Sequence, residues 1–228
     1  MSGFADSFAK AGELLPLLAQ GAVVTLKITA MSLVAAILVS FIAGTARLSG
    51  VAAIRITALG FLEIFRGTSL IVQLFFFYFI LPLYAVRLSA ETTAVLAIGL
   101  NLGAYGSEIV RSAIKSIGKG QIEAAKSLSL PRRITFSRVI FPQALMILLP
   151  SFGNLAIEIA KATALVSLIT ITDLTQAGHN LITATGETSL IWLTVLLIYL
   201  LINTPLNLFV AWAEKWAGRS RQGESGAV

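Results

Sequence analysis

Long apolar stretches constrain this chain more than any other feature of its sequence. Residues 21–46 contain one charged side chain, Lys27, and several later stretches are similarly apolar. A bilayer core about 30 Å thick requires roughly 20 residues of helix to cross it. With 57% apolar and 12% charged residues, the chain is too apolar for a soluble domain of this length. The sequence therefore predicts an all-α integral membrane protein.

Five stretches are long and apolar enough to be predicted membrane spans: residues 21–46, 56–84, 92–110, 139–159 and 189–212. Residues 160–171 are apolar but about half as long as a span requires, so we expect a re-entrant or gate element there. A polar stretch, 172–188, follows. The prediction is one transmembrane domain at 19–216, with an extracytoplasmic segment at 1–18 and a disordered cytoplasmic tail at 217–228.

A basic loop between the third and fourth spans sets the expected orientation. Seven of the 17 Lys and Arg residues lie between residues 111 and 138, where Glu123 is the one acidic residue. Lys and Arg resist translocation, so the loop is expected to stay in the cytoplasm. This places the N-terminus outside and the C-terminus inside, with 13 of the 17 basic residues on the cytoplasmic side or its boundary. The small residues after Glu123 favour a short helix in loop 112–138 that another protein can approach closely.

Polar side chains inside the predicted spans have two interpretations. Asn154, Glu158 and Lys161 share one helical face of the fourth span. They could form a self-neutralising ion pair with a packing amide, or they could line a path for a polar solute, because ionisable groups in lipid tend to face cavities or partners. In the third span, we expect Glu108 to neutralise Arg111, three residues further on, rather than to act in transport.

Several kinds of chemistry are not predicted for this chain. It has no phosphate-binding loop for ATP, no cysteine, and one histidine, His179, which is too few for a multi-histidine metal site. No catalytic residues and no metal site are therefore expected. The basic residues gather at span ends and in one loop, which is typical of membrane orientation and not of nucleic-acid binding.

Three segments resemble the permease subunits of ATP-binding-cassette (ABC) importers for polar amino acids. They are residues 65–70 (Phe-Arg-Gly-Thr-Ser-Leu) followed by Gln73 and Leu74, residues 104–111 (Ala-Tyr-Gly-Ser-Glu-Ile-Val-Arg), and residues 120–125 (Gly-Gln-Ile-Glu-Ala-Ala). The loop matches the importer motif Glu-Ala-Ala-x3-Gly-x9-Ile-x-Leu-Pro at Glu123, Ala124, Ala125 and Pro142. It departs from the motif at Ser129, Val139 and Phe141. Serine in place of the motif glycine keeps a small side chain but gives up easy access to positive φ.

The resemblance implies a multi-pass protein of the bacterial inner membrane with four kinds of partner. Two cytoplasmic ATPase subunits would bind ATP and Mg, while this chain would bind no cofactor. A second permease subunit, identical or paralogous, would complete the pathway within the membrane lipid. A periplasmic solute-binding protein would deliver a polar amino acid, or alternatively an opine or an ectoine-like compatible solute. No nucleic acid is expected as a partner.

The resemblance also implies two sets of site residues. The coupling helix, around residues 121–130, would contact the ATPase, and its candidate residues are Gln121, Glu123, Ala124, Ala125 and Ser129. The candidate pathway residues are Arg66, Gln73, Asn101, Asn154, Glu158 and Lys161. An ion-coupled secondary transporter is disfavoured because the chain shows no internal repeat, and a channel subunit would leave the basic loop without a purpose. A membrane enzyme would require a convergent catalytic cluster.

Overall fold

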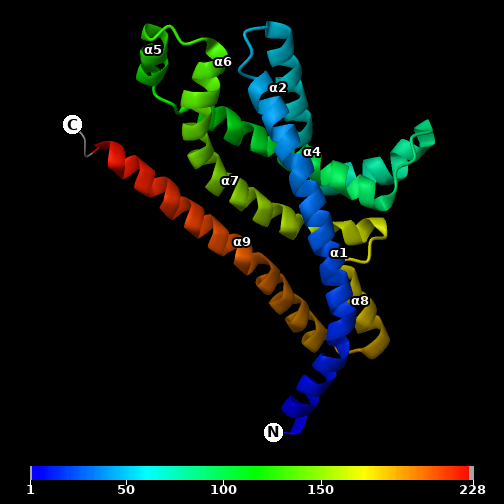
Figure 1. The fold of residues 1–228 in the computed structure, drawn as a ribbon. Coiled ribbons are helices and arrows are strands. Elements are labelled where there is room, and N and C mark those ends of the chain that lie inside the picture. The colour runs from blue at the N-terminus through cyan, green and yellow to red at the C-terminus, as the bar shows by residue number, and fades with distance from the viewer. Residues whose placement is uncertain (1, 226–228) are drawn as a thin grey trace.

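The computed structural model describes residues 2–225, and every regular element in that range is helical (Figure 1). The first helix, α1 (Ser2–Ala46), is 45 residues long and contains Pro16. Its segment Leu15–Ala46 is long and apolar enough to cross a membrane. The helix therefore begins well before the predicted span at 21–46, and the expected extracytoplasmic segment is continuous with that span, apart from Met1, which lies outside the described residues.

Helices of very different length follow α1 along the chain: α2 (Ala52–Gly67), α3 (Leu70–Phe75), η1 (Phe76–Ile80), η2 (Leu81–Tyr84), α4 (Ala90–Lys115), α5 (Lys119–Ser127), α6 (Arg132–Ile134), η3 (Thr135–Ile140), α7 (Phe141–Ala162), η4 (Thr163–Ile169), α8 (Leu174–Thr185) and α9 (Thr188–Ser225). Four candidate spans are present: Leu15–Ala46, Ala90–Lys115, Arg132–Ile169 and Thr188–Ala217. The predicted span at 56–84 is instead two helical segments bent by 101°, so the number five holds only if that pair counts as one span.

Close packing of α1 on α4 forms the centre of the fold. Gly99, Gly103 and Gly106 lie on the face of α4 that meets α1. A Cβ atom on Gly103 would lie 2.7 Å from Cβ of Val39, well inside van der Waals contact. Ser40 Oγ also donates a hydrogen bond to the Gly103 carbonyl, at 3.2 Å. Small residues at a helix interface let two membrane helices approach closely, and these glycines perform that role here.

The segment after α7 differs from the prediction. Residues 160–171 do not form a separate re-entrant element: α7 continues to Ala162 and passes directly into the 3₁₀ helix η4. The chain then turns at Thr170, which has a φ of 72°. The polar stretch that follows contains a helix, α8, that was not predicted from the sequence.

Local capping explains why α8 forms in a polar stretch. The Asp173 carboxylate accepts hydrogen bonds from the backbone N–H groups of Thr175 and Gln176, at 3.2 and 3.0 Å. Gly186, with a φ of 75°, ends the helix. These are the residue types that commonly start and stop helices, so the signal was present in the sequence. The Tyr199 hydroxyl from α9 donates to the same carboxylate at 3.3 Å, which joins α8 to the last span.

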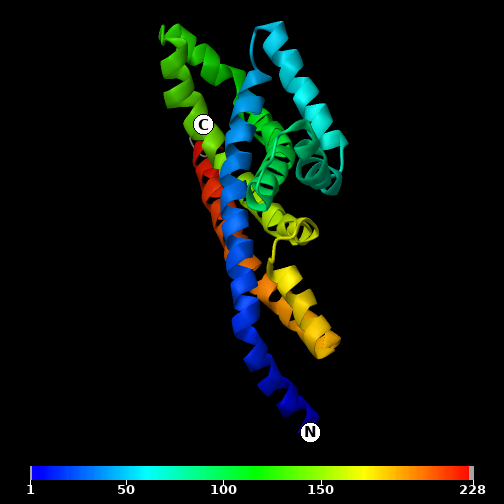
Figure 2. The ribbon, with the colours of Figure 1, turned by 90° about the vertical axis from the view of Figure 1, so that its right-hand side faces the viewer.

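The last helix, α9, reaches Ser225. Residues 217–225, which were expected to be disordered, are therefore helical, while residues 226–228 lie outside the described range. In both views, α5 and the turn between α1 and α2 lie at one end of the molecule, and α8 with the start of α1 lies at the other (Figures 1 and 2). The basic loop and the N-terminal helix start are thus at opposite ends of the molecule.

Candidate functional site

The short helix α5 lies in the basic loop where the sequence predicted one. Its C-terminus closes with two backbone hydrogen bonds: Ser129 N–H donates to the Lys126 carbonyl at 2.8 Å, and Leu130 N–H donates to the Ala125 carbonyl at 3.0 Å. This is the Schellman arrangement, in which the residue after the cap adopts a left-handed conformation and is usually glycine. Ser129 has a φ of 50°. The serine that replaces the motif glycine therefore occupies the conformation that glycine adopts most easily.

The two motif alanines differ in burial on α5. Ala125 is 3% exposed, and α5 packs against η3 of the same chain. Gln121, Glu123 and Ala124 are exposed. Ala125 was expected to contact a partner, but in this structure it supports the loop from inside. The other three residues lie on the outward surface of the helix, together with Lys119, Gly120, Lys126 and Ser127.

A second candidate site is a pocket between α2, α4 and α7, with a volume of about 370 Å³. Arg66, Tyr105, Glu108, Asn154 and Glu158 are among its lining residues. The Arg66 guanidinium lies over the ring of Tyr105, 5.0 Å from its centroid, in a cation–π arrangement. The structure thus brings together three of the six predicted pathway residues, from α2 and from α7.

Asn154, Glu158 and Lys161 are exposed along α7. No ion pair joins Glu158 to Lys161 among the residues that the structure describes. The self-neutralising pair, one of the two interpretations of these residues, is therefore not formed in this conformation. Lys161 does not line the pocket that holds the other two.

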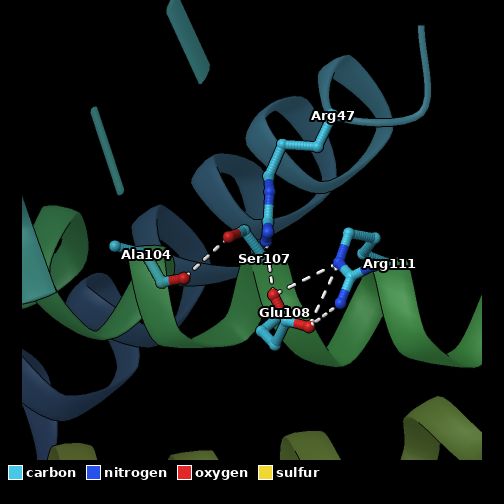
Figure 3. Close-up of polar contacts among 5 residues, drawn as sticks. All are labelled: Arg47, Ala104, Ser107, Glu108 and Arg111. Carbon is cyan, nitrogen blue, oxygen red and sulfur yellow. Dashed lines mark hydrogen bonds and ion pairs between the residues drawn. The ribbon is translucent and has the colours of Figure 1, made fainter. Parts of the chain in front are cut away.

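Glu108 binds two arginines (Figure 3). Arg111 donates to its carboxylate from Nε, at 3.1 and 3.2 Å, and from a terminal nitrogen. The predicted pairing of Glu108 with Arg111 is confirmed. A second pair, with Arg47 just after the end of α1, was missed, because Arg47 is 61 residues away in sequence and only the packing of α1 on α4 brings it close. The three side chains fasten the ends of both helices together and carry a net positive charge.

Gln73 and Asn101 lie outside the pocket. Both are buried, and they satisfy the backbone at the end of α2, where the chain bends. Asn101 Nδ2 donates to the Phe65 carbonyl at 2.8 Å, and Gln73 Nε2 donates to the same carbonyl at 3.0 Å and to Thr68 Oγ1 at 2.6 Å. Their geometry gives them a role in holding the α2–α3 bend. Buried amides with such partners are not free to bind a solute.

The part of the chain that the structure describes contains no group of three metal-binding side chains of the His, Cys, Asp or Glu type. His179, on α8, is exposed.

Comparison with known proteins identifies the family. Residues 36–219 match the family model described as "Binding-protein-dependent transport system inner membrane component". A probable amino-acid ABC transporter permease protein, y4tF of Sinorhizobium fredii, is 41% identical over 214 residues, covering 90% of each chain. The glutamine transport system permease protein GlnP of Escherichia coli is 38% identical over 203 residues, covering 88% of this chain and 93% of GlnP.

The fold is similar to that in a crystal structure of an amino acid ABC transporter with histidines, with a TM-score of 0.85 and 30% identity. The match covers 91% of this chain and 97% of that one. Proteins of this family are transport components, not enzymes, and work with a separate ATPase and a binding protein. Because the family model spans most of the chain and the relatives match about nine tenths of it, this protein belongs to the binding-protein-dependent transport system inner membrane components, the permease subunits of ABC importers.

Proposed function

We propose that this chain and a second permease subunit form the translocation pathway of an importer for a polar amino acid, and that the pocket between α2, α4 and α7 contacts the cargo. One observation carries the proposal: Arg66, Asn154 and Glu158 line a single pocket within otherwise apolar membrane segments. Ionisable groups at such depth are expensive and usually face a cavity or a partner. The names of the relatives, which include a glutamine permease, support an amino acid as cargo.

The pocket has the chemistry that a zwitterion requires. An amino acid carries a carboxylate, which the Arg66 guanidinium can bind through two parallel hydrogen bonds, and an ammonium, which the Glu158 carboxylate can accept. The Asn154 amide can donate to or accept from a polar side chain of the cargo. A volume of about 370 Å³ lies within the usual range of small-molecule sites. Glu108 lines the same pocket but is already paired with two arginines, whereas Glu158 has no ion-pair partner among the residues that the structure describes.

The exposed face of α7 supports the proposal of a second permease subunit. Asn154, Glu158 and Lys161 are uncovered in the single chain, and they would contact lipid if the chain acted alone. A second subunit, identical or paralogous, would cover this face and enclose the pathway between the two chains. The exposed apolar residues of α1 and α9 suit contact with lipid chains instead.

The outward face of α5 is proposed to dock on the ATPase. Ala124 lets the backbone of a partner approach closely, while the exposed Gln121 and Glu123 can form hydrogen bonds across the contact. ATP and Mg would bind in that partner. Closure of the ATPase pair around ATP would then move α5, and α4 would move with it because only three residues separate the two helices. The periplasmic binding protein would deliver cargo at the opposite end.

Uptake assays on the reconstituted transporter test the pocket. The complete complex in liposomes, with its binding protein, would be assayed for uptake of radiolabelled polar amino acids, with opines and ectoine as competitors. Glu158→Gln should lower the uptake rate about 10- to 100-fold, the value of a lost charge-assisted hydrogen bond. The matched control is Glu63→Gln, which removes an exposed acid on α2 that does not line the pocket. Equal uptake by the two variants would refute the proposed role of the pocket.

A separate experiment tests α5. Ala124→Asp should leave the permease folded, because the side chain is exposed, but should release the ATPase or uncouple hydrolysis from uptake. Burying that unpaired charge in the contact costs several kcal/mol. Ala124→Ser is the control of similar size and should retain the ATPase. Normal ATPase binding and uptake by Ala124→Asp would place the contact elsewhere on the chain.

A further inference from the structure

One hydrogen bond joins two segments of the chain that continue from the proposed cargo pocket. Tyr78 of η1 and Thr170, which follows η4, bring their hydroxyl groups to 3.0 Å from each other, although 92 positions separate them in sequence. Neither hydroxyl has another hydrogen-bond partner among the described residues. In both views the blue-green hairpin that contains η1 and the yellow segment that contains η4 lie away from α5 (Figures 1 and 2).

Both segments lead away from the pocket on its outer side. Tyr78 lies twelve residues after Arg66, beyond the 101° bend, and Thr170 lies twelve residues after Glu158, beyond the end of α7. The two segments that supply the pocket with a cation and an acid therefore meet again at this contact. Because α7 follows the basic loop, the residues after Glu158 are farther from α5. With α5 on the cytoplasmic side, as proposed above, the contact lies on the outer side of the pocket.

Thr170 holds a backbone conformation that its side chain disfavours. Its φ is 72° and its ψ is 10°, in the left-handed region. Ala85, Ser129 and Thr170 are the non-glycine residues of the described range with a positive φ, and of these Thr170 alone is β-branched. For a β-branched residue this region is a genuine outlier. Such strain persists only where surrounding contacts hold it, and it clusters at switch regions.

The helices on both sides of the contact are irregular. The 3₁₀ helix η4 is seven residues long, whereas such helices rarely exceed three or four, and η1 is a π-helix. A stretch of 3₁₀ helix often marks a hinge, and π-helical turns are frequent at functional sites. Val166 and Ile169 of η4 are fully buried in the core that Tyr78 borders, but the hydrogen bond itself is exposed. Water can replace an exposed hydrogen bond at little net cost, so this bond can form and break repeatedly.

We propose that the hydrogen bond between Tyr78 and Thr170 is a latch on the outer side of the cargo pocket, and that it opens each time cargo enters. The inference rests on the proposed cargo pathway. While the latch is closed, the hairpin after α2 and the η4 segment after α7 are held together. When it opens, Thr170 can return to an ordinary φ, which changes the direction in which the chain continues to α8. The helices α8 and α9 would then move together, because Tyr199 of α9 binds the Asp173 cap of α8.

A reversible crosslink across the latch tests the proposal, because the chain has no cysteine of its own. The complete transporter in liposomes, with its binding protein, would carry Tyr78→Cys together with Thr170→Cys, joined by a short bifunctional thiosulfonate reagent. Uptake of radiolabelled polar amino acids should be lost on crosslinking and should return on reduction. The wild-type complex and each single variant, treated in the same way, control for modification of one thiol or of the partner subunits.

The chain also offers a matched control pair. Thr175 of α8 and Tyr199 of α9 bring their hydroxyl groups to 2.9 Å, between two helices that share a buried core. Thr175→Cys with Tyr199→Cys should therefore crosslink without loss of uptake. Unchanged uptake by the transporter crosslinked between residues 78 and 170, or an equal loss in both pairs, would overturn the latch. Neither result bears on the pocket itself, which Glu158→Gln tests separately.

A second measurement does not need a crosslink. Ile169 is fully buried at the end of η4, so labelling of Ile169→Cys by a maleimide, followed on this chain by mass spectrometry, reports opening there. Adding Tyr78→Phe removes one hydroxyl and should speed labelling about 2- to 10-fold, the usual value of one hydrogen bond. The control is Tyr84→Phe, the same change at an exposed tyrosine of the same hairpin whose hydroxyl has no hydrogen-bond partner among the described residues. Equal labelling rates with the two changes would also overturn the proposal.

Discussion

Replacing Ser129 with glycine should stabilise the end of α5. Ser129 holds a φ of 50°, and its side chain makes no hydrogen bond among the described residues. A left-handed conformation costs an L-residue roughly 1–2 kcal/mol. Glycine avoids this cost, but it loses more conformational freedom on folding, and that loss offsets about 0.5–1 kcal/mol of the gain. The expected net gain is therefore about 0.5–1 kcal/mol, with both backbone hydrogen bonds of the Schellman arrangement retained.

Hydrogen–deuterium exchange of the isolated permease, without its ATPase, measures this local stability directly. Amides of residues 119–130 should exchange about 2- to 5-fold more slowly in Ser129→Gly than in the wild type, if they exchange through opening of this loop. Ser127→Gly is a control with the same chemistry and the opposite sign. Ser127 is the last residue of α5, and its Oγ donates to the Glu123 carbonyl at 3.1 Å; glycine loses this hydrogen bond and has a lower helix propensity, so exchange should be faster. Unchanged or faster exchange in Ser129→Gly would refute the reasoning.

Three further predictions concern the core, the loop and the topology. Gly103→Ala should lower the free energy of unfolding by about 1–3 kcal/mol, because the added methyl group overpacks against α1. The control Gly60→Ala should raise the free energy of unfolding slightly, because its Cβ would meet no atom within 4 Å. A denaturant titration in detergent compares the two variants. Ala125→Asp should increase hydrogen exchange throughout α5 even without the ATPase, because the charge would be buried against η3. An alkaline phosphatase fusion after Leu88 should be active and one after Trp216 inactive, and reversed activities would contradict the orientation.

The sequence predicted the apolar spans well because hydropathy depends on residues next to one another in the chain. Each predicted span falls within a helix or a bent pair of helices. The bend itself was missed. It depends on Asn101 from α4 reaching the Phe65 carbonyl at the end of α2, 36 residues away, and no local pattern indicates such a contact. The helix α8 was not predicted for another reason. Its capping residues, Asp173 and Gly186, are typical of helix ends, but the polar composition of the stretch between them did not indicate a helix.

The candidate site was predicted in part. Arg66, Asn154 and Glu158 were identified because charged and amide groups are rare in apolar spans, and they line one pocket. Tyr105 stacks on Arg66 in that pocket and was not singled out as a site residue, since an aromatic residue in a span is ordinary. Gln73 and Asn101 have the same polar character, yet they hydrogen-bond to backbone and to each other.

Composition, span length and the distribution of basic residues were sufficient to establish from the sequence alone that this is a helical membrane protein with a basic loop on one side. These properties follow from the cost of placing each residue in lipid, which is nearly independent of the rest of the fold. Only the tertiary structure decided that Ala124 faces outward while Ala125 faces η3, and that Glu108 binds Arg47 as well as Arg111. The direction a side chain faces depends on which helices pack beside its own, and that packing is set by contacts between residues far apart in the chain.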